Sequence, residues 1–504
     1  MPTKNSFAGV LTKELSPDHP FQPYILKAQS SKILVIKCLF LCLTASPIFA
    51  QQLDSVVTST TYVYLDDIVV TGNRKTKAWI ILRELEFAKG DSLSVADLPA
   101  TLERNRLRLM NTGLFSSAKI EMLPVPTPQR LRLQITVVET WYIYPIPLFE
   151  LADRNFNVWW DEFHHSLRRV NYGIDLSYLN LTGHADGLKV KGQFGYNNRY
   201  ELSYRFPPFN REGTIGMQTS VAYSRTHEVG YLTTGNKVLF YRNSELWMFR
   251  QIAATANFFW RPKLLSTHTF TFEYRDNRIS DTIAKTLNPD FFLGGSTRQH
   301  HFSAVYRYAT DHRDIKPYPL HGWHAVVEAR QNGLLPTDDL HLSRLFAEYN
   351  QYFSFNKKLS LEMAFKGRTT LPRSKPPYYN NQALGYGGSF VRGYEYYVAD
   401  GLDYFVTKTA LHFNLFDRNF NLGKWMPVKA FQVFPLKLYL SFNNDVGYAN
   451  DPWYRTGNPV SNRWLYGYGV GLDFVAYYDK TARIEWSCND LGQRGFYIQI
   501  NTGL

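Results

Sequence analysis

The chain has 504 residues, a formal net charge of +13 and an aromatic content of 16% spread over Tyr, Phe and Trp. The length predicts more than one domain, and so many aromatic side chains are typical of membrane β-barrels, which carry aromatic girdles at both water–lipid boundaries. The charges are scattered through alternating segments, so they favour a polar lumen or contact with anionic headgroups over binding to nucleic acid.

Residues 31–50 have the pattern of a secretory signal peptide. Lys32 supplies positive charge, an apolar run follows, and Ala50 is a small residue at the expected cleavage position. Residues 1–30 form an N-terminal extension to which we assign no role. Two of the three cysteines lie in the signal, so Cys488 alone belongs to the mature chain, which excludes an intramolecular disulfide and a cysteine metal cluster. We expect no metal and no cofactor.

Residues 61–140 are predicted to form one compact α+β domain. Hydrophobic periodicity and turn signals give the order β-α-α-β-β, with elements over residues 62–70, 78–85, 95–111, 117–123 and 131–139. This order in about 75 residues suits a single small domain. Residues 141–169 are expected to be a connector rich in Trp and Pro, placed either at the membrane interface or as packing between this domain and the rest.

From residue 170 to residue 504 the sequence alternates with period two. In residues 199–206, for example, Tyr, Leu and Phe fall on one face and Arg, Glu and Ser on the other. One apolar and one polar face, repeated in segments of about ten residues, indicates a transmembrane barrel. We predict about 16 strands, an even number that lets the sheet close, with the first over 172–181, the fifth over 228–240 and the last over 495–504. The predicted fold class is mainly β: a 16-stranded antiparallel transmembrane β-barrel preceded by one small α+β domain.

Two segments resemble one known family. The run from Asn111 to Ser116, with the element order around it, is similar to a POTRA domain, the periplasmic module of BamA-like proteins. After the predicted eleventh strand, the run Phe390-Val391-Arg392-Gly393-Tyr394 resembles the Val-Arg-Gly-Phe/Tyr signature of the BamA/TamA superfamily of outer-membrane assembly factors, the bacterial surface antigen type. The resemblance covers residues 61–504. It implies that this loop folds back into the lumen and that its Arg pairs with an acidic residue of the inner wall.

The alternation along two later strands supplies candidate partners for Arg392. The apolar residues of 434–448 share one face, which places Asp445 on the luminal face, and the same reasoning over 465–478 places Asp473 there. We expect Asp445 to be the partner, with Asp473 second. Glycine in a strand often marks the close approach of another backbone. We therefore expect room for the loop beside three luminal glycines: Gly467, Gly469 and Gly471.

The sequence favours a protein that is not an enzyme. Within each of the pairs His164-His165 and His300-His301, the two side chains would point to opposite faces of a strand, so each pair is a poor metal chelate. The sequence contains neither a phosphate-binding Gly-x-x-x-x-Gly-Lys-Ser/Thr loop nor a Gly-x-Ser-x-Gly nucleophile elbow. A barrel hydrolase, with its catalytic side chains on distant strands, is the least favoured alternative.

The resemblance implies a location in the bacterial outer membrane, with the POTRA-like domain in the periplasm. The expected function is assistance in inserting or translocating client proteins, with a client strand pairing at a weak seam between the first and last strands. The alternative is a dedicated secretion or lipid-transport channel for one partner. A single POTRA domain favours a specialised relative over the central assembly machine. Expected partners are outer-membrane lipid, client outer-membrane or secreted polypeptides, and accessory periplasmic or lipoprotein subunits, but not nucleic acid.

Overall fold

A computed structural model describes residues 62–501, apart from residues 124, 126–128, 154–155, 157, 208, 211–213, 388, 424–425, 427–431 and 478–479. The predicted N-terminal extension, the predicted signal peptide and residues 502–504 of the last predicted strand lie outside the described residues. Among the helices that the structure describes, none is long and apolar enough to cross a membrane.

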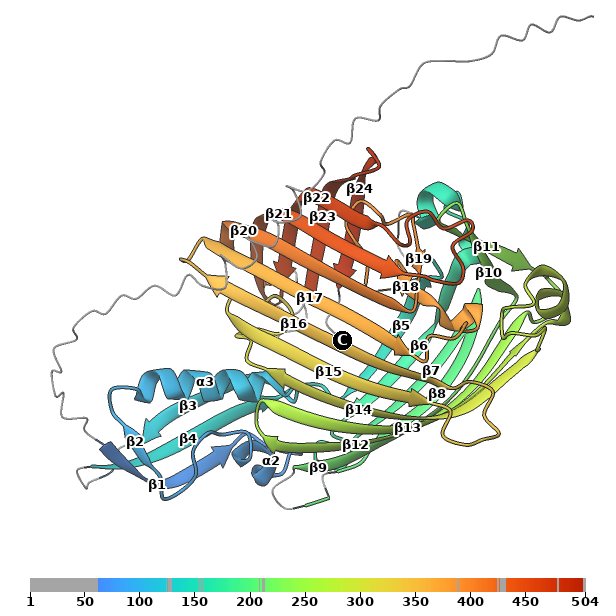
Figure 1. Cartoon of the computed structure of the whole chain (residues 1–504). Coiled ribbons are helices and arrows are strands. Elements are labelled where there is room, and N and C mark those ends of the chain that lie inside the picture. The colour runs from blue at the N-terminus through green and yellow to red at the C-terminus, as the bar shows by residue number, and fades with distance from the viewer. Residues whose placement is uncertain are drawn as a thin grey trace, which may run out of the picture. The chain divides into compact units, whose positions relative to one another are not determined.

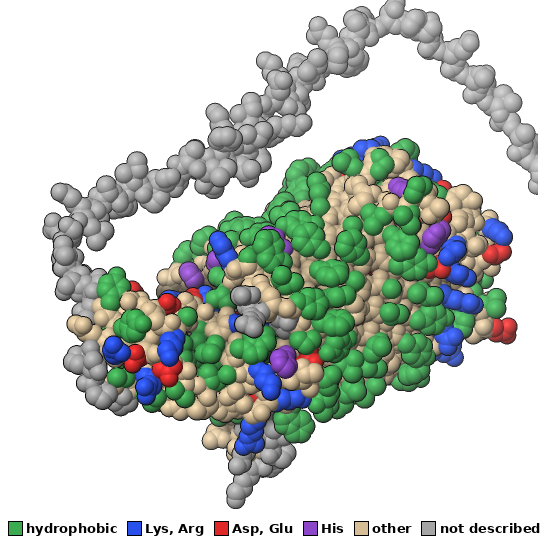
Figure 2. Space-filling model, turned by 90° about the horizontal axis from the view of Figure 1, so that it is seen from below, with side chains coloured by type: hydrophobic (Ala, Val, Ile, Leu, Met, Phe, Trp, Pro, Cys, Tyr) green, Lys and Arg blue, Asp and Glu red, His purple; other side chains and the backbone are tan. Residues whose placement is uncertain are grey.

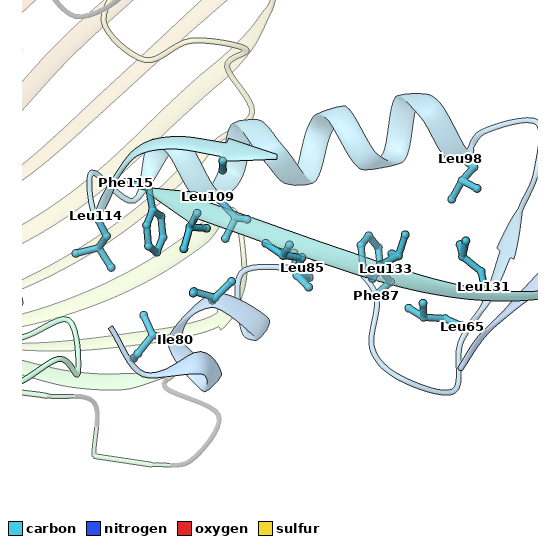
Figure 3. Close-up of a cluster of buried hydrophobic side chains, with 14 residues drawn as sticks. Leu65, Ile80, Leu85, Phe87, Leu98, Leu109, Leu114, Phe115, Leu131 and Leu133 are labelled. Atoms are coloured by element: carbon cyan, nitrogen blue, oxygen red, sulfur yellow. The ribbon is translucent and has the colours of Figure 1, made fainter. Parts of the chain in front are cut away.

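The first domain packs two helices against a small sheet. Its elements are β1 (Tyr62–Thr71), α2 (Ala78–Leu82), β2 (Ser92–Ser94), α3 (Leu98–Asn111), β3 (Phe115–Leu123) and β4 (Arg130–Glu139). The sheet order is β2-β1-β4-β3, and the short strand β2 is an addition to the predicted order. Leu109 of α3 and Leu133 of β4 are fully buried in the shared core that Figure 3 shows between helix and sheet. Helix α3 stops before Gly113, whose φ of +72° is the left-handed conformation that terminates helices.

Glu139, the last residue of β4, holds the loop that follows β1. Its carboxylate accepts hydrogen bonds from the backbone N–H groups of Lys75, at 3.0 Å, and Thr76, at 2.6 Å. Burial by itself would raise the pKa of Glu139, but these donors outweigh burial and lower that pKa below its usual value. The ionised carboxylate therefore stabilises this loop.

Replacing Glu139 by Gln should loosen this loop in a pH-dependent way. Because the folded pKa is lowered, the stabilisation is fully present above the ordinary glutamate pKa of about 4.3 and is lost as pH falls through the lower folded value. We expect the loop to lose roughly 1 kcal/mol of stabilisation in Glu139→Gln at neutral pH. The amides of Lys75 and Thr76 should therefore exchange hydrogen about fivefold faster. Hydrogen-exchange mass spectrometry on the full chain, with both proteins at the same pH, measures this.

The matched control is Glu121→Gln, because Glu121 lies on the neighbouring strand β3 in an exposed pair with Lys119. This variant should leave exchange at Lys75 and Thr76 unchanged. A Glu139→Gln difference that did not shrink as the pH was lowered through the acidic range would contradict a role for the ionised carboxylate.

The second domain is a 16-stranded antiparallel sheet formed by the described residues, with strands in sequence order from one edge, β5, to the other, β24. Figure 1 shows these strands side by side in a curved wall. The strands are β5 (Ile143–Leu151), β6 (Val170–Leu179), β7 (Gly187–Gly195), β8 (Asn197–Arg205), β9 (Ile215–Thr226), β12 (Phe249–Lys263), β13 (Ser266–Ile279), β14 (Arg298–Asp311), β15 (Gly322–Asn332), β16 (Leu342–Ser354), β17 (Leu359–Leu371), β20 (Asp403–Asn421), β21 (Val433–Asn450), β22 (Trp464–Ala476), β23 (Lys480–Asn489) and β24 (Arg494–Asn501).

The barrel strands present one apolar face outward and one polar or small-residue face inward. Along β22, Tyr466, Tyr468 and Val470 are exposed, whereas the alternate residues Gly467 and Asp473 are buried. Figure 2 shows hydrophobic side chains covering much of one face of the molecule, with Lys and Arg gathered toward its edges. The predicted fold class is confirmed.

The predictions for one connector and one barrel strand are wrong, although the total of 16 strands holds for the described residues. Residues 141–169, expected to be a connector, contain β5, which pairs antiparallel with β6. Residues 228–240, expected to be the fifth barrel strand, instead belong to a separate hairpin of β10 (Glu228–Thr234) and β11 (Lys237–Arg242). The edge strands are therefore β5 and β24, and we call the gap between them the seam.

Short helical segments lie between the strands. They are η1 (Val158–Glu162), η2 (Leu167–Arg169), η3 (Thr282–Leu287) and η4 (Tyr378–Asn380).

Candidate functional site

The connection between β17 and β20, residues 372–402, packs against the inner face of the barrel, and we call it the luminal loop. It contains η4 and a two-strand pair, β18 (Gln382–Leu384) and β19 (Ala399–Asp400). Val391 and Tyr394 of this loop are buried in one hydrophobic cluster with wall residues of three strands, Val406 of β20, Ala449 of β21 and Leu465 of β22. The loop therefore has its own small core against the wall.

The predicted motif forms a tight turn within this loop. The N–H of Tyr394 donates to the carbonyl of Val391 at 3.1 Å, and Gly393 has a φ of +80°. A four-residue turn with a positive φ at its third residue is the type II pattern, which favours glycine at that place. The turn directs Arg392, its second residue, toward the wall.

Four wall residues receive this turn, and we call them the loop seat: Asp445 of β21, Gly467 of β22, and Glu485 and Asn489 of β23. Asp445, Gly467 and Asn489 are cross-strand neighbours in one row. The backbone N–H of Arg392 donates to Asp445 at 3.1 Å, and the side-chain amide of Asn489 donates to the carbonyl of Gly393 at 2.6 Å. A methyl group on Gly467 would overlap the carbonyl oxygen of Arg392. The missing side chain of Gly467 thus makes room for the loop backbone.

The Arg392 side chain bridges two buried carboxylates. Its guanidinium donates to Asp445 and, through Nε at 3.0 Å, to Glu485. Both carboxylate side chains are 0% exposed, and the Arg392 side chain is 6% exposed. Lys408 of β20 also lies 3.2 Å from Asp445, and Arg483 of β23 lies 4.0 Å from Glu485, so each carboxylate faces two cations. Buried charges are tolerated when they are paired in this way.

The remaining motif residues contact the wall around the seat. The Lys408 ammonium lies 4.0 Å from the centre of the Phe390 ring, and the Tyr394 hydroxyl donates to Asp490. Val391 packs over Gly447 of β21, where an added Cβ would come within 2.5 Å of its side chain.

Only one of the three glycines expected beside the loop contacts it in the structure. Gly467 lies under the loop backbone, as described above, but Gly469 and Gly471 do not. An added Cβ on Gly469 would first meet Ser487 and Trp486 of β23, and one on Gly471 would first meet the Ser441 hydroxyl of β21. These two glycines relieve crowding within the wall.

Asp473, expected as the second partner of Arg392, has other partners. It accepts two hydrogen bonds from Arg483, at 2.6 and 2.8 Å, and one from the Tyr318 hydroxyl at 2.8 Å. Register explains the difference, because six residues along a strand separate Asp473 from Gly467, about 20 Å. The expectation for Asp473 is therefore wrong, and Glu485 takes that place beside Arg392.

The sequence reasoning missed Glu485, Asn489 and Gly447 as contacts of the loop. The signal was present, because Arg483, Glu485, Ser487 and Asn489 alternate with Ile484, Trp486 and Cys488 in the last part of β23. Applying to this strand the rule used for the two preceding ones would have placed Glu485 in the lumen. Among the described residues, no group of three or more His, Cys, Asp or Glu side chains could hold a metal ion.

Comparison with known families identifies the barrel. A family model described as the Omp85 superfamily domain matches residues 180–476, more than half of the chain. The chain belongs to the Omp85 superfamily. A second model, described as POTRA, surface antigen variable number repeat, matches residues 63–140. These matches confirm the resemblance to the BamA/TamA type that the loop motif and the first domain indicated.

Similar proteins agree with this assignment. The outer membrane protein assembly factor BamA of Nitratidesulfovibrio vulgaris is 34% identical over 77 residues, which are 15% of this chain and 9% of that protein's length. BamA from Haemophilus ducreyi lacking POTRA domains 1–3 has a similar fold, with a TM-score of 0.51 and 12% identity over 87% of this chain and 84% of the other. CdiB from Escherichia coli gives a TM-score of 0.53 at 12% identity, over 87% and 76% of the two chains.

Membership of the Omp85 superfamily fixes the location. The barrel lies in the outer membrane and the POTRA domain in the periplasm. Members of this family act in outer-membrane protein insertion or secretion and are not enzymes.

Proposed function

We propose that this Omp85 protein assists the insertion of client polypeptides into the outer membrane. The observation that carries this proposal is the seam, because no ladder joins β24 to β5 among the described residues. In lipid, unpaired backbone groups of a strand edge cost several kcal/mol each. Such an edge is a template for another extended strand. A client strand that pairs there gains satisfied backbone groups as it enters the bilayer.

The luminal loop supports insertion at the seam over passage through an open pore. The loop has a hydrophobic core against β20, β21 and β22, and Arg392 is held at two buried carboxylates. At a second place, Tyr318 of the connection between β14 and β15 donates to Asp473 on the inner wall. Side chains and backbone thus occupy the lumen beside β20–β23, which favours the sheet edge as the surface for a client.

A dedicated secretion channel for one partner is the second candidate. The specific observation in its favour is that the motif turn is held at the wall by the few polar contacts of the loop seat. Release of the loop would open a polar lumen. In either case the partners are unfolded polypeptides, and accessory periplasmic or lipoprotein subunits would deliver them.

Depletion of the protein followed by quantitative outer-membrane proteomics separates the two candidates. Assistance in insertion predicts that several barrel proteins decrease together while outer-membrane lipoproteins, which contain no barrel, keep their levels. A channel for one partner predicts the loss of one secreted polypeptide with barrel proteins unchanged. The second result would overturn the proposed function.

A further inference from the structure

A polar cavity lies between the inner wall and the luminal loop, on strands other than those of the loop seat. It has a volume of about 300 Å³ and is lined by Arg344 of β16, Arg368 of β17, Tyr404 of β20 and, from the loop, Asn380 and Gln382. The strands β16, β17 and β20 are consecutive in the sheet (Figure 1). None of the described residues that line the cavity is acidic, so its arginines meet no carboxylate there.

Arg344 and Arg368 have backbone carbonyls as their acceptors among the described residues. The Arg344 guanidinium donates to the carbonyl of Asn380, and that of Arg368 donates to the carbonyls of Gln382, at 2.7 Å, and Gly401, at 2.9 Å. In both side chains Nε is buried and has no hydrogen-bond partner within the described part of the chain. A buried donor of a charged group is unfavourable without an acceptor. Each Nε–H therefore points to an acceptor that comes from a ligand.

Nearby carboxylates are bound to other cations. Glu273 of β13 accepts hydrogen bonds from Arg275, at 2.5 Å, and from Arg330 of β15, at 3.0 Å. Asp403, at the start of β20, accepts from Arg373. The two arginines that line the cavity from β16 and β17 thus keep their positive charges without a paired carboxylate among the described residues.

The strand register brings these like charges together. Arg330 lies directly opposite Arg344 in the ladder between β15 and β16. Arg368 lies on the next strand, two residues from Thr370, which is the ladder partner of Arg344. Like charges on adjacent strands repel each other. An anion in the cavity would reduce this repulsion and accept from both unpaired Nε–H groups.

We propose that this cavity binds phosphate, either as the free ion or as the monoester of a small molecule. Two guanidiniums without carboxylate partners match the charge of a phosphate dianion better than that of a monocarboxylate, and the planar donors of arginine fit phosphate oxygens. Small-ligand sites have volumes of about 300–1,000 Å³. This cavity is at the lower end of that range, so it has room for a phosphate group with a small substituent but not for a whole lipid.

A bound phosphate would join the luminal loop to the wall. Arg344 and Arg368 belong to the wall, whereas Asn380, Gln382 and Ser389, which line the same cavity, belong to the loop. A ligand that binds only when the loop is docked stabilises the docked state by mass action. The cavity therefore gives the loop a ligand-dependent attachment that is separate from the loop seat and does not depend on the proposed function.

Isothermal titration calorimetry on the full protein in detergent micelles tests the site. The titrants are sodium phosphate, glucose 6-phosphate and sodium acetate, at constant ionic strength and about pH 8, where phosphate is mainly the dianion. We expect saturable binding of phosphate, with an affinity at least about tenfold higher than that of acetate. Glucose 6-phosphate that binds as tightly as phosphate would identify a monoester site, and binding of phosphate alone would identify a site for the free ion. Both results support the proposal.

Arg344→Gln and Arg368→Gln each remove one guanidinium from the cavity and should weaken phosphate binding by about tenfold or more. Arg199→Gln is the matched control. Arg199 of β8 alternates with the outward-facing Tyr200 and Leu202, so it also faces inward, but it pairs with Glu201 at 2.7 Å. This variant loses the same charge and should bind phosphate as wild type does.

Protection of the loop from protease gives a second measurement. In wild type, phosphate at ten times its dissociation constant should slow cleavage within residues 372–402 by about tenfold. At the same concentration it should slow cleavage of Arg344→Gln by only about twofold, because the affinity of this variant is lower.

Three results would overturn the proposal. The first is the absence of saturable phosphate binding by the folded wild-type protein, and the second is equal affinity for phosphate and acetate. The third is the same affinity for phosphate in Arg199→Gln, Arg344→Gln and Arg368→Gln, because the ion would then bind elsewhere. The first two are measured on the wild-type protein, so they decide the matter even where a variant does not fold.

Discussion

Arg392→Ala should lower the free energy of unfolding of the barrel by about 3–5 kcal/mol, the usual cost of removing one member of a buried ion pair. The substitution leaves Asp445 and Glu485, both fully buried, without the guanidinium that bridges them. Lys408 still faces Asp445 at 3.2 Å and Arg483 still faces Glu485 at 4.0 Å, so each carboxylate keeps one cation but loses the guanidinium that joins the two. The temperature at which the folded band disappears in semi-native electrophoresis should therefore fall.

Release of the luminal loop should accompany this loss. Arg392 also donates its backbone N–H to Asp445, and that contact depends on the turn staying in the seat. We expect the variant to insert into the membrane, to become sensitive to protease in residues 372–402, and to deliver less client. Single-channel recording should show a higher ion conductance, because the lumen is no longer filled by the loop.

Arg463→Ala is the matched control. Arg463 pairs with Asp490 close to the same loop, but the two side chains are 39% and 26% exposed, and exposed pairs contribute about 0–1 kcal/mol. Arg392→Lys keeps the charge but loses the planar set of guanidinium donors. Its free energy of unfolding should therefore lie between those of wild type and Arg392→Ala. Equal decreases in the free energy of unfolding for Arg463→Ala and Arg392→Ala would show that the buried contacts of Arg392 contribute no more than an exposed ion pair.

The strand order of the barrel shows where alternation predicts well and where it does not. Fifteen of the predicted barrel segments overlap strands of the sheet, because a lipid-facing and a lumen-facing residue alternate along each. The segment missed, β5, contains Pro145 and Pro147, which argue against a strand unless it lies at an edge. The segment wrongly included, residues 228–240, carries Gly235-Asn236. Their φ values of +56° and +65° are typical of a hairpin turn that the sequence also signals.

The sequence predicts which face of its strand each site residue occupies, but not how neighbouring strands align. Alternation places both Asp445 and Asp473 on the luminal face, where the structure has them buried. Which of them meets Arg392 depends on how β21, β22 and β23 align, since Asp445 is opposite Gly467 while Asp473 is opposite Tyr439. The pairing register is set by contacts between strands, so it cannot be predicted from the alternation within a single strand.

Gly467→Ala should displace the loop even though it leaves every charge in place. The added methyl group would overlap the carbonyl oxygen of Arg392 and lie 2.8 Å from its carbonyl carbon, and backbone atoms cannot rotate away as a side chain can. Overpacking of this kind costs up to about 3 kcal/mol. The variant should show the same protease sensitivity in residues 372–402 and the same rise in conductance as Arg392→Ala.

Gly471→Ala separates this effect from the general effect of removing glycine from a strand. Gly471 lies on the same strand and the same face, but the first atom its methyl group would meet is the Ser441 hydroxyl oxygen, at 2.8 Å, which can rotate. Because alanine also restricts the unfolded chain, this substitution should change stability by less than about 1 kcal/mol in either direction. Loop release in Gly471→Ala would contradict the assignment of Gly467 as the floor of the seat.

The double variant Arg392→Ala/Gly467→Ala tests whether both residues act on one structure. Both single changes remove the same turn from the same seat, so the second change should add little once the first has released the loop. The loss in the double variant should therefore stay near that of Arg392→Ala alone, about 3–5 kcal/mol, well below the sum of the singles. Strict additivity would mean that the ion pairs and the glycine floor stabilise the barrel independently, and the loop seat would not be one unit.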